Sequence, residues 1–513
     1  MRIVFELSSN FIYRERHEIM QYTSTRSRCA LSAAQVIVKG IAEDGGLFVP
    51  DSFPVISEET FQTLTKASYV ERAETVLSLF LNDFSPEEIR SCVRGAYIGK
   101  FENDEPAPLA EPVPGVNLLE LWHGPTCAFK DMALQLLPRL LSVSASKTAP
   151  GRTMVILVAT SGDTGKAALD GFANVKGTKI VVFYPAQGVS AMQKLQMQTQ
   201  AGDNVAVCGI EGNFDDAQNG VKAIFADAEI RDLLDRANMD LSSANSINFG
   251  RLVPQIVYYV SAYCDLRKTG RIRPGEPFNI VVPTGNFGNI LAAEYAKRMG
   301  VPVAKLICAS NRNNVLTDFI ETGVYDRNRP FHTTSSPSMD ILISSNLERL
   351  LYHLSGNDPY LVRDLMAQLK IGGKYVVPDA LKRKIQEEFT AGWCSDEEAA
   401  KLIGTLFREQ GYLCDTHTAV ALKVCREYRE KTGDRTPCVV ASTASPYKFA
   451  PAVLKAAGGG DADGFEAVER LQALTGAPVP GPIAGLRGKP VLHKACIRKD
   501  GMEEFLLKFL GIR

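Results

Sequence analysis

Runs of apolar, often β-branched residues alternate with amphipathic segments through the middle of the chain. The run TMVILVAT at 153–160 is apolar on both faces of an extended chain, as in a strand buried within a sheet. Segment 250–268 instead repeats apolar residues every three or four positions, which predicts a helix. This alternation is typical of a mostly parallel α/β sheet. Strands are expected at 153–160, 179–184, 204–208, 278–282, 304–309 and 437–441, and helices at 190–200, 215–234, 250–268, 290–299 and 447–457.

The alternation does not extend over the whole chain. The part before residue 111 reads as mixed helix and loop, and the part from 312 to about 430 as helical and irregular. The expected organisation is therefore an N-terminal extension (1–19), an N-terminal domain (20–110), an α/β core (111–311) with a smaller lobe at about 151–255, a mostly helical insertion (312–430), and a return to the core with a C-terminal segment (431–513).

Composition narrows the class of protein without specifying a function. The chain has 513 residues, of which 57 are basic and 58 acidic, so neither nucleic acid nor an anionic membrane is favoured as a partner. Eleven cysteines occur without a Cys-x-x-Cys pair, which argues against a metal site and for free thiols in a reducing compartment. No apolar stretch reaches transmembrane length and no signal peptide is evident. A cytoplasmic protein is expected.

Lys130 lies in an unusual setting, in LWHGPTCAFKDMALQLLPRLL. A lysine normally keeps its ammonium hydrated, yet this one follows a Gly-Pro turn and is surrounded by apolar residues. Its side chain could lie at a helix start and reach water. Alternatively, an apolar setting lowers the pKa of the amine, which can then attack a carbonyl and form a Schiff base.

Two glycine-containing loops each follow an expected strand and open an expected helix, where free backbone N–H groups favour an anion. In PTGNFGNI, Gly285 and Gly288 allow close approach to a phosphate, and Asn286 and Asn289 add donors. An ordinary capped turn explains this loop equally well. In ATSGDTGKAA, Ser161 and Thr164 could hold a carboxylate or phosphate, or Asp163 could simply cap the helix.

The lysine and the two loops together indicate one cofactor. Pyridoxal 5′-phosphate has an aldehyde for Lys130 and a phosphate for the loop at 285–289. The loop at 161–164 would then hold the carboxylate of an amino-acid substrate.

Eight stretches, in order from about Met20 to Ala450, resemble the threonine synthase family in its longer microbial and fungal form. They are YTSTRS, EDGGLFVPDSFP, HGPTCAFKD, SGDTG, ANSINFGRLVPQIVYY, GNFGN, SPSMDILISSNLERLL and STASPYKF. The resemblance implies a tryptophan synthase β-like fold (fold type II of the pyridoxal-phosphate enzymes), with two α/β lobes and the cofactor between them.

The resemblance also implies roles for individual residues. Lys130 would bind the cofactor covalently and act as the catalytic base, and Thr443 would place a hydroxyl against the pyridine nitrogen. The cofactor-phosphate loop would comprise Gly285, Asn286, Phe287, Gly288 and Asn289. The substrate would contact Ser161, Gly162, Asp163 and Thr164, with Ser246, Asn248 and Arg251 at its phosphate; Arg251 could instead be a structural ion-pair partner. His123 and His417 are assigned no catalytic role.

The implied activity is that of a carbon-oxygen lyase in threonine biosynthesis. It would convert O-phospho-L-homoserine and water to L-threonine and phosphate by γ-elimination and addition of water at the β-carbon, as a monomer or homodimer. Two alternatives stay open. One is a phospholyase or phosphatase acting on the same substrate, and the other is a non-catalytic relative that binds the cofactor.

Overall fold

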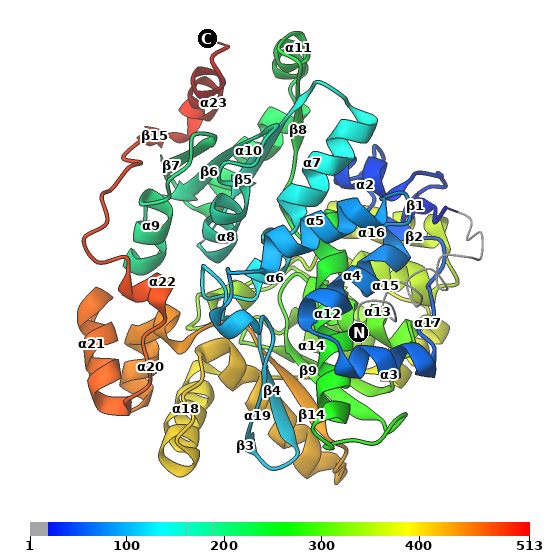
Figure 1. Ribbon diagram of the computed structural model, residues 1–513, viewed down its shortest axis with the longest axis vertical. Coiled ribbons are helices and arrows are strands. Elements are labelled where there is room, and N and C mark those ends of the chain that lie inside the picture. The colour runs from blue at the N-terminus through cyan, green and yellow to red at the C-terminus, as the bar shows by residue number, and fades with distance from the viewer. Residues whose placement is uncertain (1–18, 161, 188, 513) are drawn as a thin grey trace.

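The computed structural model of the chain describes residues 19–160, 162–187 and 189–512. It contains two α/β lobes, each built around its own mostly parallel sheet (Figure 1). The central strands of both sheets are buried along most of their length, which is why they appear in the sequence as continuous apolar runs. The α/β class predicted from the alternating pattern is confirmed.

The larger sheet has six strands in the order β13-β10-β9-β14-β4-β3. All neighbours are parallel except β3, which pairs antiparallel with β4 at the edge. The strands are β3 (Leu109–Val113), β4 (Val116–Glu120), β9 (Phe278–Pro283), β10 (Val303–Ser310), β13 (Phe389–Trp393) and β14 (Cys438–Ser442). The sequence predicts β9, β10 and β14 but not β3, β4 or β13.

The smaller sheet has five parallel strands in the order β15-β7-β6-β5-β8. The strands are β5 (Thr153–Ala159), β6 (Thr178–Pro185), β7 (Val205–Glu211), β8 (Met239–Ser242) and β15 (Cys496–Arg498). Four of them come from 153–242, and β15 is supplied by the far end of the chain. The smaller lobe therefore includes a segment outside the 151–255 range expected from the sequence.

Helices connect the strands of both sheets. They include α8 (Asp163–Phe172), α9 (Ala191–Gln198), α10 (Phe214–Ala226), α11 (Ala228–Arg236), α12 (Phe249–Lys268) and α13 (Gly288–Arg298). The prediction of a single helix at 215–234 is wrong, because one helix ends before Asp227 and a second begins after it. The Asp227 carboxylate accepts hydrogen bonds from the amides of Glu229 and Ile230 and so starts α11 as a separate helix.

The N-terminal region packs against the large lobe. Its elements are β1 (Tyr22–Ser24), α2 (Ala33–Lys39), β2 (Phe48–Pro50), α3 (Glu58–Lys66), α4 (Tyr69–Phe80) and α5 (Pro86–Tyr97). Apolar residues of α4 and α12 belong to one continuous core. At this contact the buried Arg72 pairs with Asp265 of α12 at 2.7 Å. The region thus helps to fix α12, whose N-terminal end belongs to the candidate site.

The stretch expected as a helical insertion also contributes sheet and loop structure. It contains α14 (Val315–Thr322), β11 (Val324–Asp326), α15 (Leu347–Leu354), α16 (Pro359–Gly372), β12 (Lys374–Val376), α17 (Asp379–Glu388), β13, α18 (Asp396–Gln410) and α19 (Thr416–Thr432). The loop between β11 and α15, with a short 3₁₀ turn η2 (Pro337–Met339), reaches the candidate site.

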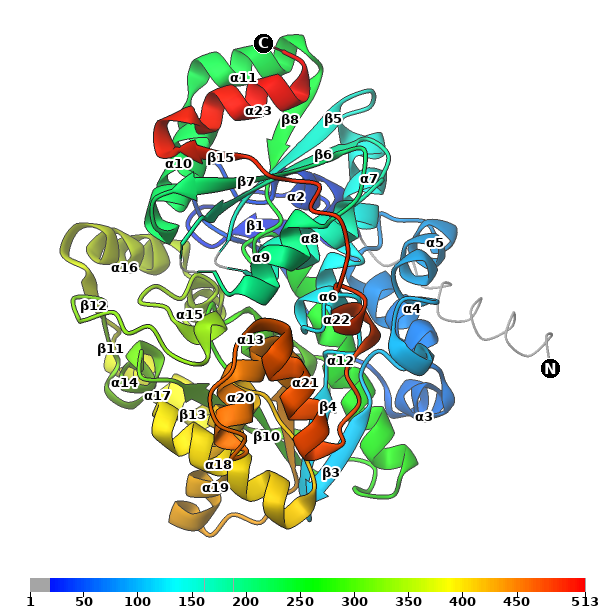
Figure 2. The same ribbon diagram turned by 90° about the vertical axis from the view of Figure 1, so that its left-hand side faces the viewer.

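The C-terminal segment joins the two lobes. After β14 come η3 (Pro446–Phe449), α20 (Ala450–Ala456), α21 (Gly464–Thr475) and α22 (Gly481–Ala484) beside the large lobe. The helix expected at 447–457 is thus a 3₁₀ turn followed by α20. Figure 2 shows the chain then running up to β15 and α23 (Met502–Leu510) on the small lobe. Within the described ranges, no helix has both the length and the apolar character needed to cross a membrane.

Candidate active site

Lys130 is the first residue of α6 (Lys130–Leu134), and the end of β14 holds it in place. The amide of Phe129 donates to the carbonyl of Thr443 at 2.8 Å, and the amide of Ser445 donates to the carbonyl of Cys127 at 3.1 Å. These main-chain bonds join two segments far apart in sequence. They place Lys130 beside Thr443, as expected if both contact one cofactor.

The Lys130 amine is buried and does not reach out to solvent. The residue is 8% exposed, and its Nζ donates to Ser338 Oγ at 3.3 Å and lies 3.9 Å from Asp163 Oδ2. Burial lowers the pKa of Lys130 to about 8, with Asp163 opposing the shift and the cations of Arg251 and Lys448 adding to it. A substantial fraction of free amine near neutral pH follows, as a nucleophile or base requires.

The loop at 285–289 has the features of a phosphate site. Helix α13 begins after Phe287, whose φ is 62°, and it has neither a side-chain cap nor an acidic residue in its first turn. The Asn289 Nδ2 is buried and has no hydrogen-bond partner among the described residues. A side chain at Gly285 would come within 2.6 Å of the Ser338 carbonyl, so only glycine fits. Unused donors at a helix start suit the phosphate of pyridoxal 5′-phosphate.

The loop at 161–164 is arranged differently from the loop at 285–289. Ser161 lies outside the described residues. Gly162 has a φ of 147° and faces the Gln193 side chain, which an added Cβ would meet at 2.5 Å. The Thr160 hydroxyl accepts hydrogen bonds from the amides of Gly162 and Gly165, both at 3.0 Å, and so caps the first turn of α8. Thr164 is half-buried in the first turn of α8.

Asp163 points away from its own helix amides and toward other side chains. Its Oδ1 is 2.9 Å from Lys448 Nζ and accepts from Gln193 Nε2 at 2.9 Å. Burial alone would raise the pKa of Asp163, but the charges of Lys448 and Lys130 outweigh it and hold the pKa below the usual value for an aspartate. The simple helix cap considered from the sequence is therefore not what this carboxylate does.

The SINFGR stretch places its three candidate residues differently. Ser246 lies beside the cofactor-phosphate loop and accepts from Asn346 Nδ2 at 3.2 Å. Asn248 caps α12, accepting from Gly250 N and donating to Ile37 O, so its amide serves the fold and a contact to substrate phosphate stays a prediction. Arg251 is buried and donates to the Ala244 carbonyl at 2.9 Å.

Arg251 does not form the structural ion pair that the sequence left open. In the described part of the chain, no carboxylate lies within ion-pair distance of its guanidinium, and burial lowers its pKa to about 10. The site thus contains three buried cations, on Lys130, Arg251 and Lys448, and two carboxylates, on Asp163 and Asp131. Burial raises the pKa of Asp131 to about 6. The excess of positive charge favours an anionic ligand.

Sequence reasoning missed Ser338, Lys448 and Asp415, while His417, to which it assigned no catalytic role, has a structural one. Ser338 and Lys448 lie within stretches that resemble the family, SPSMDIL and STASPYKF, but no local feature distinguishes either residue there. His417 Nδ1 lies 2.9 Å from Asp415 Oδ1, and its Nε2 accepts from the amide of Ser338 at 3.2 Å. His417 therefore orients the Ser338 segment. His123 is held between Glu102 and Glu120 at 2.9 and 2.8 Å, a structural position.

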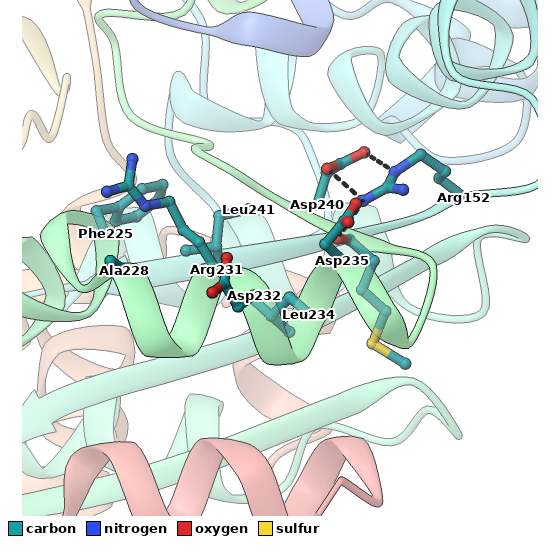
Figure 3. Close-up of a pocket in the computed structure, with 10 residues that line it drawn as sticks. Arg152, Phe225, Ala228, Arg231, Asp232, Leu234, Asp235, Asp240 and Leu241 are labelled. Carbon is teal, nitrogen blue, oxygen red and sulfur yellow. Dashed lines mark hydrogen bonds and ion pairs between the residues drawn. The ribbon is translucent and has the colours of Figure 1, made fainter.

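A surface pocket of about 550 Å³ on the small lobe is separate from this site. Figure 3 shows Arg152 pairing there with Asp240 and Asp235, near α11. None of the predicted site residues lines it, and the charges of Arg152 are already matched. Across the residues that the structure describes, no cluster of His, Cys, Asp or Glu could hold a metal ion.

The two-lobed α/β fold, the buried lysine and the uncapped α13 define a pyridoxal-phosphate-dependent enzyme. The family profile "Pyridoxal-phosphate dependent enzyme" matches residues 110–443. The chain belongs to the threonine synthase family of these enzymes. Profiles for the threonine synthase N terminus and C-terminal region match residues 21–97 and 418–480. The resemblance to this family, the fold type and the pyridoxal 5′-phosphate cofactor inferred from the sequence are confirmed.

Individual relatives agree with this assignment. The chain is 39% identical to threonine synthase of Pseudomonas aeruginosa over 92% of its own length and 100% of the relative's. It matches the structure of PLP-bound threonine synthase from Brucella melitensis with a TM-score of 0.86 and 37% identity, covering 96% of this chain and 99% of that one. It is also 43% identical to human threonine synthase-like 1 over 82% of its length, but spans only 58% of that relative.

Proposed function

We propose that this chain converts O-phospho-L-homoserine and water to L-threonine and phosphate. The observation that carries the proposal is the gathering of two buried cations, on Lys448 and Arg251, around the buried amine of Lys130. Lys130 and Lys448 flank Asp163, and Arg251 lies unpaired nearby. A substrate with both a carboxylate and a phosphate supplies the negative charge that this site lacks.

Lys130 performs the proton transfers in this proposal. Bound pyridoxal phosphate withdraws electrons from the α-carbon of an attached amino acid and so makes its α-proton removable. The Lys130 amine, with its pKa lowered to about 8 mainly by burial, takes that proton and returns one later. Ser338, as hydrogen-bond acceptor, fixes the direction of the amine. Loss of a β-proton, departure of phosphate from the γ-carbon, protonation of the γ-carbon and addition of water at the β-carbon complete the reaction.

In this proposal one loop binds the phosphate of the cofactor, and the other binds anionic groups of the substrate. We assign the cofactor phosphate to residues 285–289, where the α13 amides and Asn289 Nδ2 are available. The substrate's carboxylate and phosphate fall to residues 161–164 and to Ser246 and Arg251. Thr443, whose carbonyl accepts from the amide of Phe129 next to Lys130, would supply a hydroxyl to the ring nitrogen. A cytoplasmic location and a monomer or homodimer stay predictions from the sequence.

The test is to incubate purified protein with O-phospho-L-homoserine and to quantify phosphate and amino-acid products together. Equal amounts of phosphate and threonine are the expected result. Lys130→Ala serves as the inactive control, and the same change at Lys423, which pairs with Glu398 and Glu427 on another face, serves as the matched variant. Phosphate release without threonine would refute the proposal.

A phospholyase acting on the same substrate is the second candidate, because the chain is also similar to a relative that is named only as threonine synthase-like. The chain is 43% identical to human threonine synthase-like 1 but 39% identical to the bacterial threonine synthase. The two activities share the lysine and the phosphate loop and differ in the fate of the carbon skeleton. Phosphate accompanied by 2-oxobutyrate in the assay above would select this candidate.

A further inference from the structure

Lys448 is a buried cation of the site that takes no part in the proposed proton transfers. It lies in η3, directly after β14, and is 3% exposed. Its Nζ donates to the carbonyl of Thr126 at 2.8 Å and forms an ion pair with Asp163 Oδ1 at 2.9 Å. Thr126 precedes Lys130 by four residues, so Lys448 contacts both the loop that carries the base and the helix start that faces it.

The Asp163 carboxylate lies between two lysines but is shared unequally. Oδ1 contacts Lys448 and Gln193, each at 2.9 Å. Oδ2 is 3.9 Å from Lys130 Nζ, and the Ser338 hydroxyl donates to it at 3.4 Å. The close ion pair is thus with Lys448, and Lys130 donates instead to the neutral oxygen of Ser338 at 3.3 Å.

We propose that Lys448 is a positioning residue for Lys130, because it holds the Asp163 carboxylate in a close ion pair and keeps it out of one with the Lys130 amine. A carboxylate in direct contact with Lys130 would stabilise its ammonium form, and an ammonium has no lone pair for attack or proton abstraction. This inference rests on the proposed role of Lys130 as the cofactor lysine and base.

Four charged groups face Lys130, each from a different element. They are Asp163 at the start of α8, Arg251 on α12, Lys448 on η3 and Asp131 on α6. The two carboxylates raise the pKa of Lys130, and the two cations lower it, in addition to burial. Removing Lys448 acts twice in the same direction: its repulsion is lost, and the Asp163 carboxylate becomes free to pair with Lys130.

The test measures Lys130 directly in the full-length chain after the cofactor has been removed. Trace acetic anhydride is added over a series of pH values, and the acetylated Lys130 peptide is quantified by mass spectrometry. The midpoint for wild type is expected near 8. Lys448→Met should raise it by roughly one pH unit, which slows labelling at pH 7 about tenfold.

Companion variants separate this role from a merely structural one. Lys448→Arg, which keeps the charge, should retain the wild-type midpoint. Lys448→Met combined with Asp163→Asn should lose the upward shift, because the carboxylate is gone. Lys423→Met removes another largely buried paired lysine and should leave Lys130 unchanged. Should Lys448→Met fail to fold, Asp163→Asn alone must lower the midpoint.

Any one of three results would overturn the inference. They are an unchanged midpoint in folded Lys448→Met, an upward shift that persists in the double variant, and no effect of Asp163→Asn on the midpoint. Labelling requires neither cofactor nor substrate. The protein could therefore show the expected shifts of the Lys130 midpoint and yet form no threonine. That result would refute the proposed function but support the role of Lys448.

Discussion

The starts of α8 and α13 look alike in sequence but differ in structure. Both follow a buried parallel strand and a glycine-containing loop, and in neither does the N-cap residue itself supply a side-chain cap, although Thr160 accepts from the amide of Gly165 in α8. Helix α13 has no acidic residue there, and Asn289 Nδ2 is left without a described partner. Helix α8 instead begins with Asp163, a carboxylate that is paired with Lys448.

The difference is consistent with the separate roles proposed for the two helix starts. Since the donors of α13 are unused, an anion can bind there without displacing anything, which suits a cofactor phosphate that stays bound. At α8 the chain supplies its own negative charge, which is shared between two lysines. If the substrate binds at α8 as proposed, its anion has to rearrange existing contacts, as expected of a group that binds and leaves in each cycle.

Removing the lysine between the two helix starts should have the largest effect. Lys130→Ala should reduce turnover by at least roughly 10³-fold, because the variant loses both the covalent attachment and the base. Threonine formation and the absorption of protein-bound cofactor measure the two losses separately. A variant with near wild-type turnover would contradict the assignment of Lys130.

A matched pair of glycine substitutions tests the comparison itself. Gly285→Ala places a Cβ 2.6 Å from the Ser338 carbonyl, a backbone atom that cannot rotate away. Overpacking of this kind costs about 1–3 kcal/mol, so cofactor affinity should fall roughly 5- to 150-fold. Equilibrium dialysis of the cofactor measures the change.

Gly162→Ala should act on substrate and leave the cofactor largely in place. The added Cβ would meet Gln193 at 2.5 Å, and the φ of 147° is unfavourable for alanine. KM for O-phosphohomoserine should rise while cofactor affinity stays near wild type. Gly372→Ala, with open space around its Cβ, is the neutral control. Equal losses of cofactor in both site variants would remove the distinction between the two helix starts.

Sequence patterns identified much of the fold because its central strands are buried on both faces. Strands β5, β6 and β9 are continuous apolar runs, and such runs need no knowledge of their neighbours. The break at Asp227 and the addition of β15 to the small sheet could not be predicted. The break between α10 and α11 depends on the Asp227 side chain capping the amides that follow it. The position of β15 depends on pairing between segments almost 290 residues apart.

The candidate site was predictable to the extent that its chemistry lies in local motifs. Lys130 and the loop at 285–289 stand out because their residue types are unusual where they occur. Ser338 contacts Lys130 across 208 positions, and Lys448 contacts Thr126 across 322. Neither has a local feature that marks it, since a serine and a lysine are ordinary in their own segments. Only the folded chain brings them to the amine.

Ser338→Ala should have a moderate effect. The variant loses the acceptor that fixes the direction of the Lys130 amine, and one hydrogen bond of this kind corresponds to roughly a tenfold fall in kcat. Ser338→Thr keeps the hydroxyl and should recover part of the rate. Cofactor affinity should change little in either variant, so a large loss of bound cofactor would show that Ser338 supports the α13 site instead.

The smallest change that we expect is in kcat as the pH is varied. Lys130 acts as a base only when deprotonated, and its pKa lies at about 8. We therefore expect kcat to rise with pH up to about 8 and to level off above it. A profile of kcat against pH from 6 to 10 measures this. A profile that is flat down to pH 6 would mean that another group limits the reaction.

The central claim, threonine synthesis from O-phospho-L-homoserine, is tested most directly in water enriched in ¹⁸O. Cleavage of the carbon-oxygen bond followed by water addition predicts ¹⁸O in the threonine hydroxyl and none in the released phosphate. Threonine and phosphate should form in equal molar amounts. Phosphate that contains ¹⁸O together with homoserine would instead show cleavage of the phosphorus-oxygen bond and would contradict the account. Unlabelled phosphate with 2-oxobutyrate in place of threonine would also contradict it, and would identify the chain as a phospholyase.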